Sequence, residues 1–195
     1  MRIAGGLYRG RSIGAPPGLA TRPTADRARQ AVFNMLEHAA WSPGLIAARV
    51  IDLFAGSGAL GLEALSRGAA SCLFVDTDER ARAAIRDNLE ALDPKGGLLG
   101  RSRVLRRDAT TLGERSTAGV EPFGFAFLDP PYGQGYGESA LAALGAGGWL
   151  EAGAICVLEE GARETDAIVA GFQTLDARRY GAARVQLLRW SPGAE

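Results

Sequence analysis

The sequence predicts an α/β domain built on a mostly parallel sheet, and three observations carry this prediction. The 195 residues are 47% hydrophobic and 23% charged, the composition of one soluble globular domain. From about Val50 onward, short β-rich apolar runs alternate with helix-like segments, the order that crossover connections between parallel strands produce. A glycine-rich turn follows the first of these runs, at the kind of junction where α/β proteins bind ligands.

The apolar runs set the order of the elements. Strands are predicted at 49–54, 71–76, 103–108, 123–129 and 154–160. Helices are predicted at 58–67, 78–92 and 138–144, and Pro94 with two glycines stops the second. The runs 172–181 and 183–190 meet at Gly181, which predicts an antiparallel hairpin at the sheet edge.

Residues 1–40 are predicted to form a basic arm and a helix, ahead of a main domain at 41–195. The helix begins near Thr24, a plausible N-cap, and runs to His38. The first thirty residues hold six arginines against a single acid, Asp26, so this segment is a candidate phosphate-binding arm; a solvated basic tail is the alternative. The candidate contacts are Arg2, Tyr8, Arg9, Arg11, Arg22 and Arg27.

Composition excludes several classes of protein. The chain has 22 basic and 22 acidic residues, so bulk positive charge does not hold it to nucleic acid. Cys72 and Cys156 lie in apolar runs and are predicted to be buried, reduced thiols. With His38 as the one histidine, no metal site is expected. Neither a secretory signal nor a membrane span is predicted, and we expect a cytoplasmic protein.

The segment VIDLFAGSGALGLEAL predicts a nucleotide-binding loop between a strand and a helix. Gly56, Gly58 and Gly61 satisfy the G-x-G-x-x-G spacing, and Asp76 ends the next strand twenty positions after Gly56, where a ribose-binding carboxylate belongs. The alternative is a tight turn that only allows close helix packing.

Two further acids indicate which nucleotide the loop takes. Asp52 ends the first strand, where a carboxylate would oppose a pyrophosphate but favour the ammonium group of a methionine moiety. S-adenosylmethionine is therefore favoured over a nicotinamide dinucleotide. Asp108, after the third strand, is a candidate acceptor for the adenine amino group, or else a strand-end carboxylate or helix cap.

The run FLDPPYG places a second motif at the same edge of the sheet. The two prolines fix the backbone and remove two N–H donors, so Pro130, Pro131 and the Asp129 carboxylate present a rigid set of acceptors suited to an amino group. Tyr132 offers a flat face on which an extruded base can stack. A proline turn with a packed aromatic ring is the alternative.

DLFAGSG together with DPPY resembles the S-adenosylmethionine-dependent methyltransferases that modify exocyclic amino groups. RIAGGLYRGR, LATRPTADRARQAVFNML and DLFAGSGALGLEALSRGA resemble, more narrowly, the bacterial 16S ribosomal RNA guanine-N2 methyltransferases of the small subunit, from Met1 to about Tyr132. The resemblance implies a Rossmann-like, seven-stranded class I methyltransferase sheet that ends in an antiparallel hairpin, with a short basic N-terminal extension.

The resemblance also implies a role for each candidate residue. Asp52 and the backbone of Gly56 and Gly58 would hold the methionine portion of the cofactor, with Phe54 in the same set. Asp76 would hold the ribose, where the family usually has glutamate, and Asp108 the adenine amine. Asp129 and the Pro130 carbonyl would hold the target amine, beside Pro131 and Tyr132.

Four alternatives stay open. The same chemistry is possible on adenine N6 of DNA or of another RNA, or on a protein glutamine, although the basic arm favours nucleic acid. A nicotinamide-dependent oxidoreductase leaves Asp52 and the DPPY run unexplained, and a non-catalytic RNA-binding module leaves four acids unexplained. By resemblance, we expect the protein to act on 16S ribosomal RNA within the small subunit or its assembly intermediate. A monomer is expected because the domain presents one basic arm to a large particle.

Overall fold

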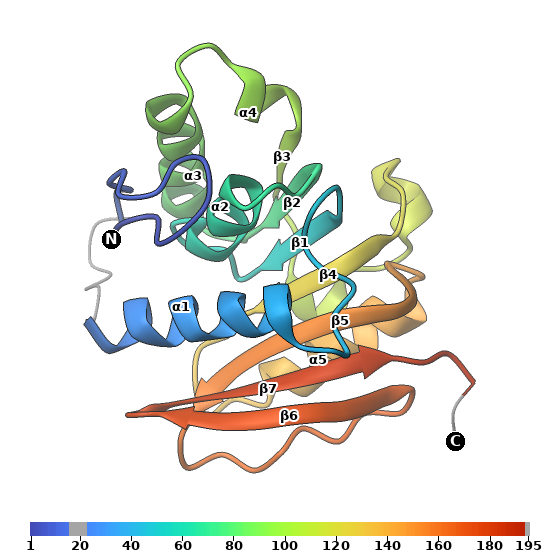
Figure 1. Cartoon of the computed structure of the whole chain (residues 1–195). Helices are drawn as coiled ribbons and strands as arrows, with labels where there is room; N and C mark the ends of the chain where they lie inside the picture. The colour runs from blue at the N-terminus through green and yellow to red at the C-terminus, as the bar shows by residue number, and fades with distance from the viewer. Residues whose placement is uncertain (16–22, 194–195) are drawn as a thin grey trace.

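Seven strands pair into a single sheet at the centre of the molecule (Figure 1). The structure is a computed structural model that describes residues 1–15 and 23–193, and the side chains of residues 23–27 lie outside the described part. The strands are β1 (Arg49–Leu53), β2 (Ser71–Val75), β3 (Ser102–Leu105), β4 (Phe123–Leu128), β5 (Leu150–Gly161), β6 (Phe172–Tyr180) and β7 (Ala183–Trp190). Their order in the sheet is β3-β2-β1-β4-β5-β7-β6.

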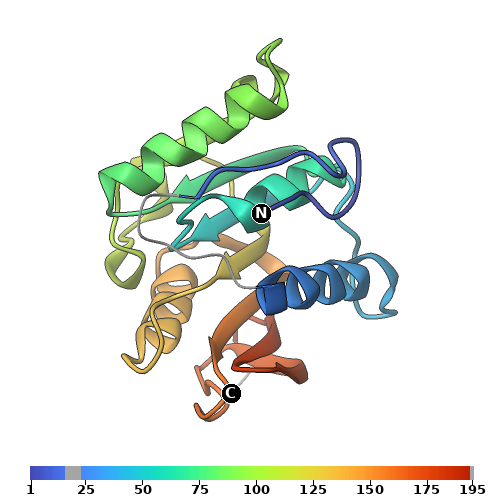
Figure 2. The same cartoon turned by 90° about the vertical axis from the view of Figure 1, so that its left-hand side faces the viewer.

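The helices lie on both faces of this sheet. They are α1 (Pro23–His38), α2 (Ala59–Ser66), α3 (Glu79–Leu92), α4 (Gly97–Gly100) and α5 (Tyr136–Ala146), with the short 3-10 turns η1 (Ala109–Thr111) and η2 (Arg115–Ala118). Figure 2 looks onto the edge where the parallel strands end, with α1 and α5 on opposite sides of the sheet. None of the helices in the described part of the chain combines the length and the apolar character of a bilayer-spanning segment.

The pairing confirms the predicted α/β class and the C-terminal hairpin. β1 is parallel to both β2 and β4, while β7 runs antiparallel between β5 and β6. The hairpin turns at Gly181, whose φ of 61° lies in the left-handed region that glycine adopts freely. β6 is thus the edge strand, and β7 is buried inside the sheet.

Strand side chains alternate between two apolar layers, as the pleat requires. Val50, Phe125 and Phe127 pack in the layer shared with α1, α2 and α3. Ile51 and Leu128 pack in the opposite layer with α5. Both faces are covered, which explains why the central strands read as continuous apolar runs.

Several predicted boundaries are wrong for identifiable reasons. The third strand ends at Leu105 rather than Asp108, because the Asp108 side chain accepts a hydrogen bond from the Thr110 N–H and begins η1. The fifth strand begins at Leu150 rather than 154, after a register shift opposite Phe123 and Phe125. The four-residue α4 is too short and glycine-rich to carry a helical pattern.

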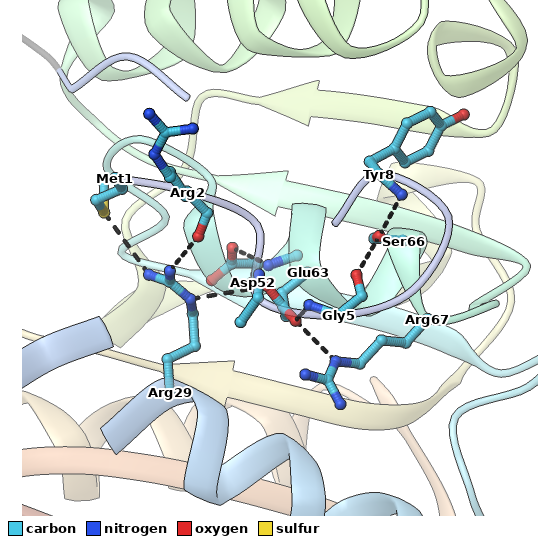
Figure 3. Close-up of polar contacts among 11 residues, drawn as sticks. Met1, Arg2, Gly5, Tyr8, Arg29, Asp52, Glu63, Ser66 and Arg67 are labelled. Carbon is cyan, nitrogen blue, oxygen red and sulfur yellow. Dashed lines mark hydrogen bonds and ion pairs between the residues drawn. The ribbon is translucent and has the colours of Figure 1, made fainter. Parts of the chain in front are cut away.

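Residues 1–15 share the core of the sheet. Ile3 and Ile13 are buried in the same apolar layer as α1 and α2. The buried Glu63 of α2 fixes this segment, since its carboxylate accepts hydrogen bonds from the N–H groups of Ala4 at 2.7 Å and Gly5 at 2.8 Å (Figure 3). Glu63 therefore joins the N-terminal segment to the helix that follows the glycine loop.

Two neighbouring residues extend this joint. The Ser66 hydroxyl donates to the Gly5 carbonyl at 2.6 Å and accepts from the Tyr8 N–H at 2.9 Å (Figure 3). Arg67 donates to Glu63 at 2.7 Å and stacks over the Phe33 ring of α1. The N-terminal segment, α1 and α2 are thus held together by one buried polar network.

We expect Glu63→Ala to lower the free energy of unfolding by about 3 kcal/mol or more, because it leaves buried N–H and guanidinium groups without their acceptor. Urea denaturation of the full chain measures the loss. Glu37→Ala is the control, since Glu37 also binds Arg67 but is 31% exposed, and its loss should stay below about 1 kcal/mol. Equal losses in the two variants would contradict a special role for Glu63.

Candidate active site

The ends of four parallel strands form the candidate site. Leu53 of β1 pairs with both Val75 and Leu128, and Leu128 pairs with Leu158 of β5. The residues that follow these positions therefore emerge side by side at one edge of the sheet, the edge that faces the viewer in Figure 2. The glycine loop and the DPPY turn meet there.

Asp52 lies buried beneath the glycine loop. Its carboxylate is 1% exposed and accepts a hydrogen bond from the Gly61 N–H at 2.9 Å (Figure 3). Gly61 belongs to the first turn of α2, where the helix dipole favours a negative charge. Burial raises the pKa of Asp52 well above its usual range, and the charges of Asp129 and Asp76 raise it further. The negative charges of Asp129 and Asp76 thus disfavour the ionised form of Asp52.

The glycine loop, residues 54–58, has a tight left-handed backbone. Phe54 and Gly56 have φ values of 55°, and Gly58 has a φ of 77°. A non-glycine residue in this region is strained, so Phe54 is held there by its surroundings. A Cβ on Gly61 would lie 2.4 Å from the Phe74 ring, so only glycine lets α2 pack this closely on β2. The glycine spacing thus serves both the turn and the packing.

The acids after β2 and β3 occupy different positions. Asp76 accepts hydrogen bonds from the N–H groups of Gly56 and Asp78, each at 2.8 Å, so it lies against the glycine loop. Asp108 is exposed and caps η1 through Thr110, whose hydrogen bonds lower the pKa of Asp108. The structure brings Asp76 to the loop, whereas Asp108 stays two strands away from β1.

The DPPY turn leaves β4 beside the loop. Pro130 is buried, whereas Asp129, Pro131 and Tyr132 are exposed at the edge. The Tyr132 hydroxyl donates to Glu159 of β5 at 2.9 Å. The turn is further tied to β5 by Glu164, whose carboxylate accepts from the N–H groups of Gly133 at 3.1 Å and Gly161 at 2.8 Å.

Glu159 is a site residue that the sequence analysis missed. It follows Leu158, the partner of Leu128, just as Asp129 follows Leu128, so the two residues emerge from neighbouring positions at the sheet edge. Asp129 is exposed at the open edge. Desolvation at that edge, with the charge of Glu159, raises the pKa of Asp129 to about 7. Burial also raises the pKa of Glu159, against the hydrogen bond from Tyr132. The two carboxyls are an interacting pair.

The three carboxylates Asp52, Asp76 and Asp129 give this edge of the sheet a negative charge. Asp52, Asp76 and Asp129 form no ion pair with any residue in the described part of the chain. Burial raises the pKa of Asp52 most, and the charges of Asp129 and Asp76 raise it further, so a positive charge placed among the three would relieve this repulsion. A cationic ligand would relieve this repulsion, whereas a pyrophosphate would add to it.

Two other residues near the loop were missed. Asn88 of α3 is buried, and its amide donates to the carbonyls of Ser57 and Gly14, each at 2.9 Å. A polar residue on the apolar face of α3, three positions after Ile85, was the signal. Tyr136 lies parallel to Phe54, with ring centroids 6.4 Å apart. Only the fold brings α5 to the loop, so no local pattern marks Tyr136.

The candidate RNA-binding residues lie on the docked N-terminal segment. Arg2 donates to the Gly10 carbonyl at 2.9 Å and Arg11 to the Ala91 carbonyl at 2.6 Å, and both residues remain exposed. Arg9 is exposed, and Tyr8 is half-buried against the core. Arg22 and the side chain of Arg27 lie outside the described residues.

The chain is similar in sequence and in fold to several known proteins. The YlbH protein of Bacillus subtilis is 41% identical over 132 residues, 68% of this chain and 67% of the relative. Ribosomal RNA small subunit methyltransferase D of Escherichia coli K12 is 37% identical over 160 residues, 82% of this chain and 74% of the relative. The solved structure of the Escherichia coli yhhF protein superposes with a TM-score of 0.78 at 33% identity, covering 98% of each chain. The family model described as conserved hypothetical protein 95 matches residues 1–189, and the chain belongs to that family.

Proposed function

We propose that this protein transfers a methyl group from S-adenosylmethionine to the exocyclic N2 amine of a guanine in 16S ribosomal RNA of the small subunit. The observation that carries this proposal is the meeting of Asp52, Asp76 and Asp129 at one sheet edge, where none of the three carboxylates is ion-paired with a residue in the described part of the chain. The relative named ribosomal RNA small subunit methyltransferase D supports the substrate class.

The residues present fit this cofactor. When bound, S-adenosylmethionine supplies a methyl group carried on a positively charged sulfonium. Asp52 and the backbone of Gly56 and Gly58 would hold its methionine portion, since a buried, repelled carboxylate favours a cation. Asp76 would hold the ribose hydroxyls, and Phe54 would lie along the bound molecule. Asp108 keeps one carboxylate oxygen on Thr110, and its other oxygen would take the adenine amine.

The DPPY turn would hold the base. A guanine amine is a weak nucleophile because its lone pair is delocalised into the ring, so acceptors that hold its hydrogens and aim the nitrogen assist the reaction. Asp129 and the Pro130 carbonyl are such acceptors, while Pro131 keeps the turn rigid and Tyr132 stacks on the base. As the nitrogen gains its methyl group, it loses one proton, which the Asp129 carboxylate takes.

The N-terminal segment would contact RNA phosphates. Its exposed arginines, with no acid before Asp26, form a local positive surface on a protein of zero net charge. Arg2, Arg9 and Arg11 lie on this surface, Tyr8 is available for stacking, and Arg22 and Arg27 belong to the same stretch of sequence. We propose that the protein acts as a monomer on the small subunit or its assembly intermediate.

Methyl transfer from radiolabelled S-adenosylmethionine to small ribosomal subunits, naked 16S RNA and DNA, followed by nucleoside analysis, tests the function. Label in N2-methylguanosine of ribosomal RNA is the expected result. Label in N6-methyladenine would support methyl transfer to an exocyclic amine but refute guanine as the substrate. No label in any substrate would refute both the reaction and the substrate.

Replacing Asp129 should separate chemistry from cofactor binding. We expect Asp129→Ala to lower kcat by about a hundredfold or more, because the amine loses the acceptor that orients it. The affinity for S-adenosylhomocysteine, measured by calorimetry, should change little. Glu151→Ala, at the opposite end of β5, is the control. Full activity of Asp129→Ala would refute the assigned role.

Replacing Asp52 should weaken the binding of the cofactor. Asp52→Asn keeps an acceptor for the Gly61 N–H but removes the charge, so we expect S-adenosylmethionine to bind about tenfold or more weakly. Calorimetry at low and high salt gives the dissociation constants. Unchanged affinity would mean that Asp52 serves only to hold α2.

The dependence of kcat/KM on pH should reflect the ionisation of Asp129. A carboxyl whose pKa is raised to about 7 is protonated below that pH and then no longer accepts the amine hydrogens, so kcat/KM for RNA should fall as the pH drops through about 7. Glu159→Gln removes the charge that helps raise this pKa, so the falling limb should move to lower pH. A limb at the same pH in both proteins would contradict the assignment to Asp129.

A further inference from the structure

Asp129 and Glu159 stand side by side at the site. Leu128 pairs with Leu158 at the end of β4, so Asp129 and Glu159 follow neighbouring positions at the sheet edge, and the charge of Glu159 acts on Asp129. Arg29 of α1 acts electrostatically on Glu159 in turn. The site thus presents two adjacent carboxylates to a substrate, although the DPPY motif supplies only one of them.

Glu159 is also held in a defined orientation. The Tyr132 hydroxyl donates to Oε1 of Glu159 at 2.9 Å, and Oε2 accepts no hydrogen bond from the described residues. The ring itself lies against Gly161, where an added Cβ would come within 3.5 Å of the Tyr132 Cδ2 atom. The carboxylate is therefore fixed to the same ring that is proposed to stack on the base.

The Watson–Crick edges of the purines differ in a way that two carboxylates detect. Guanine presents two adjacent donors, N1–H and the N2 amine. Adenine presents the N6 amine beside N1, which is an acceptor. Two ionised carboxylates accept both donors of guanine, whereas with adenine one of them faces a lone pair. A site that reads an extruded base in this way rejects the wrong partner strongly.

We propose that Glu159 is a specificity-determining residue that accepts the N1–H of the target guanine while Asp129 holds its N2 amine. This inference rests on the proposed function and deepens it, because it assigns the choice of base to β5 rather than to the DPPY turn. Tyr132 is a positioning residue in this scheme, since its hydroxyl fixes Glu159.

The test combines a variant with a matched change in the base. Two RNA substrates carry either guanine or 2-aminopurine at the mapped target position; 2-aminopurine keeps the exocyclic amine at position 2 but has an acceptor at N1. Glu159→Gln keeps an oxygen for Tyr132 and offers an amide N–H toward N1. The quantity measured is the ratio of kcat/KM for guanine to that for 2-aminopurine.

The wild-type protein should favour guanine, and Glu159→Gln should shift the ratio toward 2-aminopurine by about ten- to hundredfold, the range for one hydrogen bond to a charged group. The comparison between variants cancels the effect of the missing O6 atom. Tyr132→Phe keeps the ring and removes the O–H donor, so its ratio should shift in the same direction by less. An unchanged ratio in Glu159→Gln would overturn the proposal.

Three control measurements test whether the change in selectivity arises from Glu159 itself. Glu151→Gln removes a carboxylate from the opposite end of β5, where Glu151 pairs with Arg49, and should keep the wild-type ratio. Glu159→Gln should bind S-adenosylhomocysteine with wild-type affinity and unfold at a similar temperature. The fluorescence of 2-aminopurine reports its stacking in both proteins, independently of turnover. A wild-type protein that methylates no guanine would refute the proposed function itself, whereas an active wild type with unaltered selectivity in Glu159→Gln would refute only the role of Glu159.

Discussion

Parallel pairing of β1 with β2 on one side and β4 on the other is the constraint on which the site depends. Because these strands end together, Asp52, Asp76 and Asp129 are brought to one edge although they are far apart in the sequence. The polypeptide cannot separate them without breaking the central ladder. The charges of Asp129 and Asp76 therefore act on the buried Asp52 by virtue of the fold, and a cation bound among them would relieve that repulsion.

The short helix α2 connects this edge to the rest of the molecule. Its first turn donates to Asp52 through Gly61, and its middle and end hold the N-terminal segment through Glu63 and Ser66. On the other side of the loop, Asn88 binds both Ser57 and Gly14. A basic segment proposed to meet RNA is thus attached to the elements that shape the cofactor loop. This attachment explains why Ile3 and Ile13 are core residues rather than parts of a loose arm.

Much of the fold follows from local patterns in the sequence. Alternation of apolar runs with helical segments predicted the parallel sheet, and the turn at Gly181 predicted the hairpin, because each depends on residues close together in the chain. The boundaries were less predictable. β3 ends early because the Asp108 side chain binds the Thr110 N–H and begins η1, so a local side-chain hydrogen bond competes with the strand. β5 begins early because its register with β4 shifts, which depends on the pairing of distant strands.

The sequence by itself determined which side chains are available at the sheet edge: the glycine loop, the carboxylates near the ends of β1 and β2, and the rigid DPPY turn all belong to local motifs. Only the tertiary structure decided which further groups join them. Glu159 has no motif of its own and becomes a partner of Asp129 because Leu128 pairs with Leu158. Asn88 and Tyr136 likewise reach the loop from other elements. The physical reason is that strand register and helix packing are set by the whole core, whereas a motif records only neighbours along the chain.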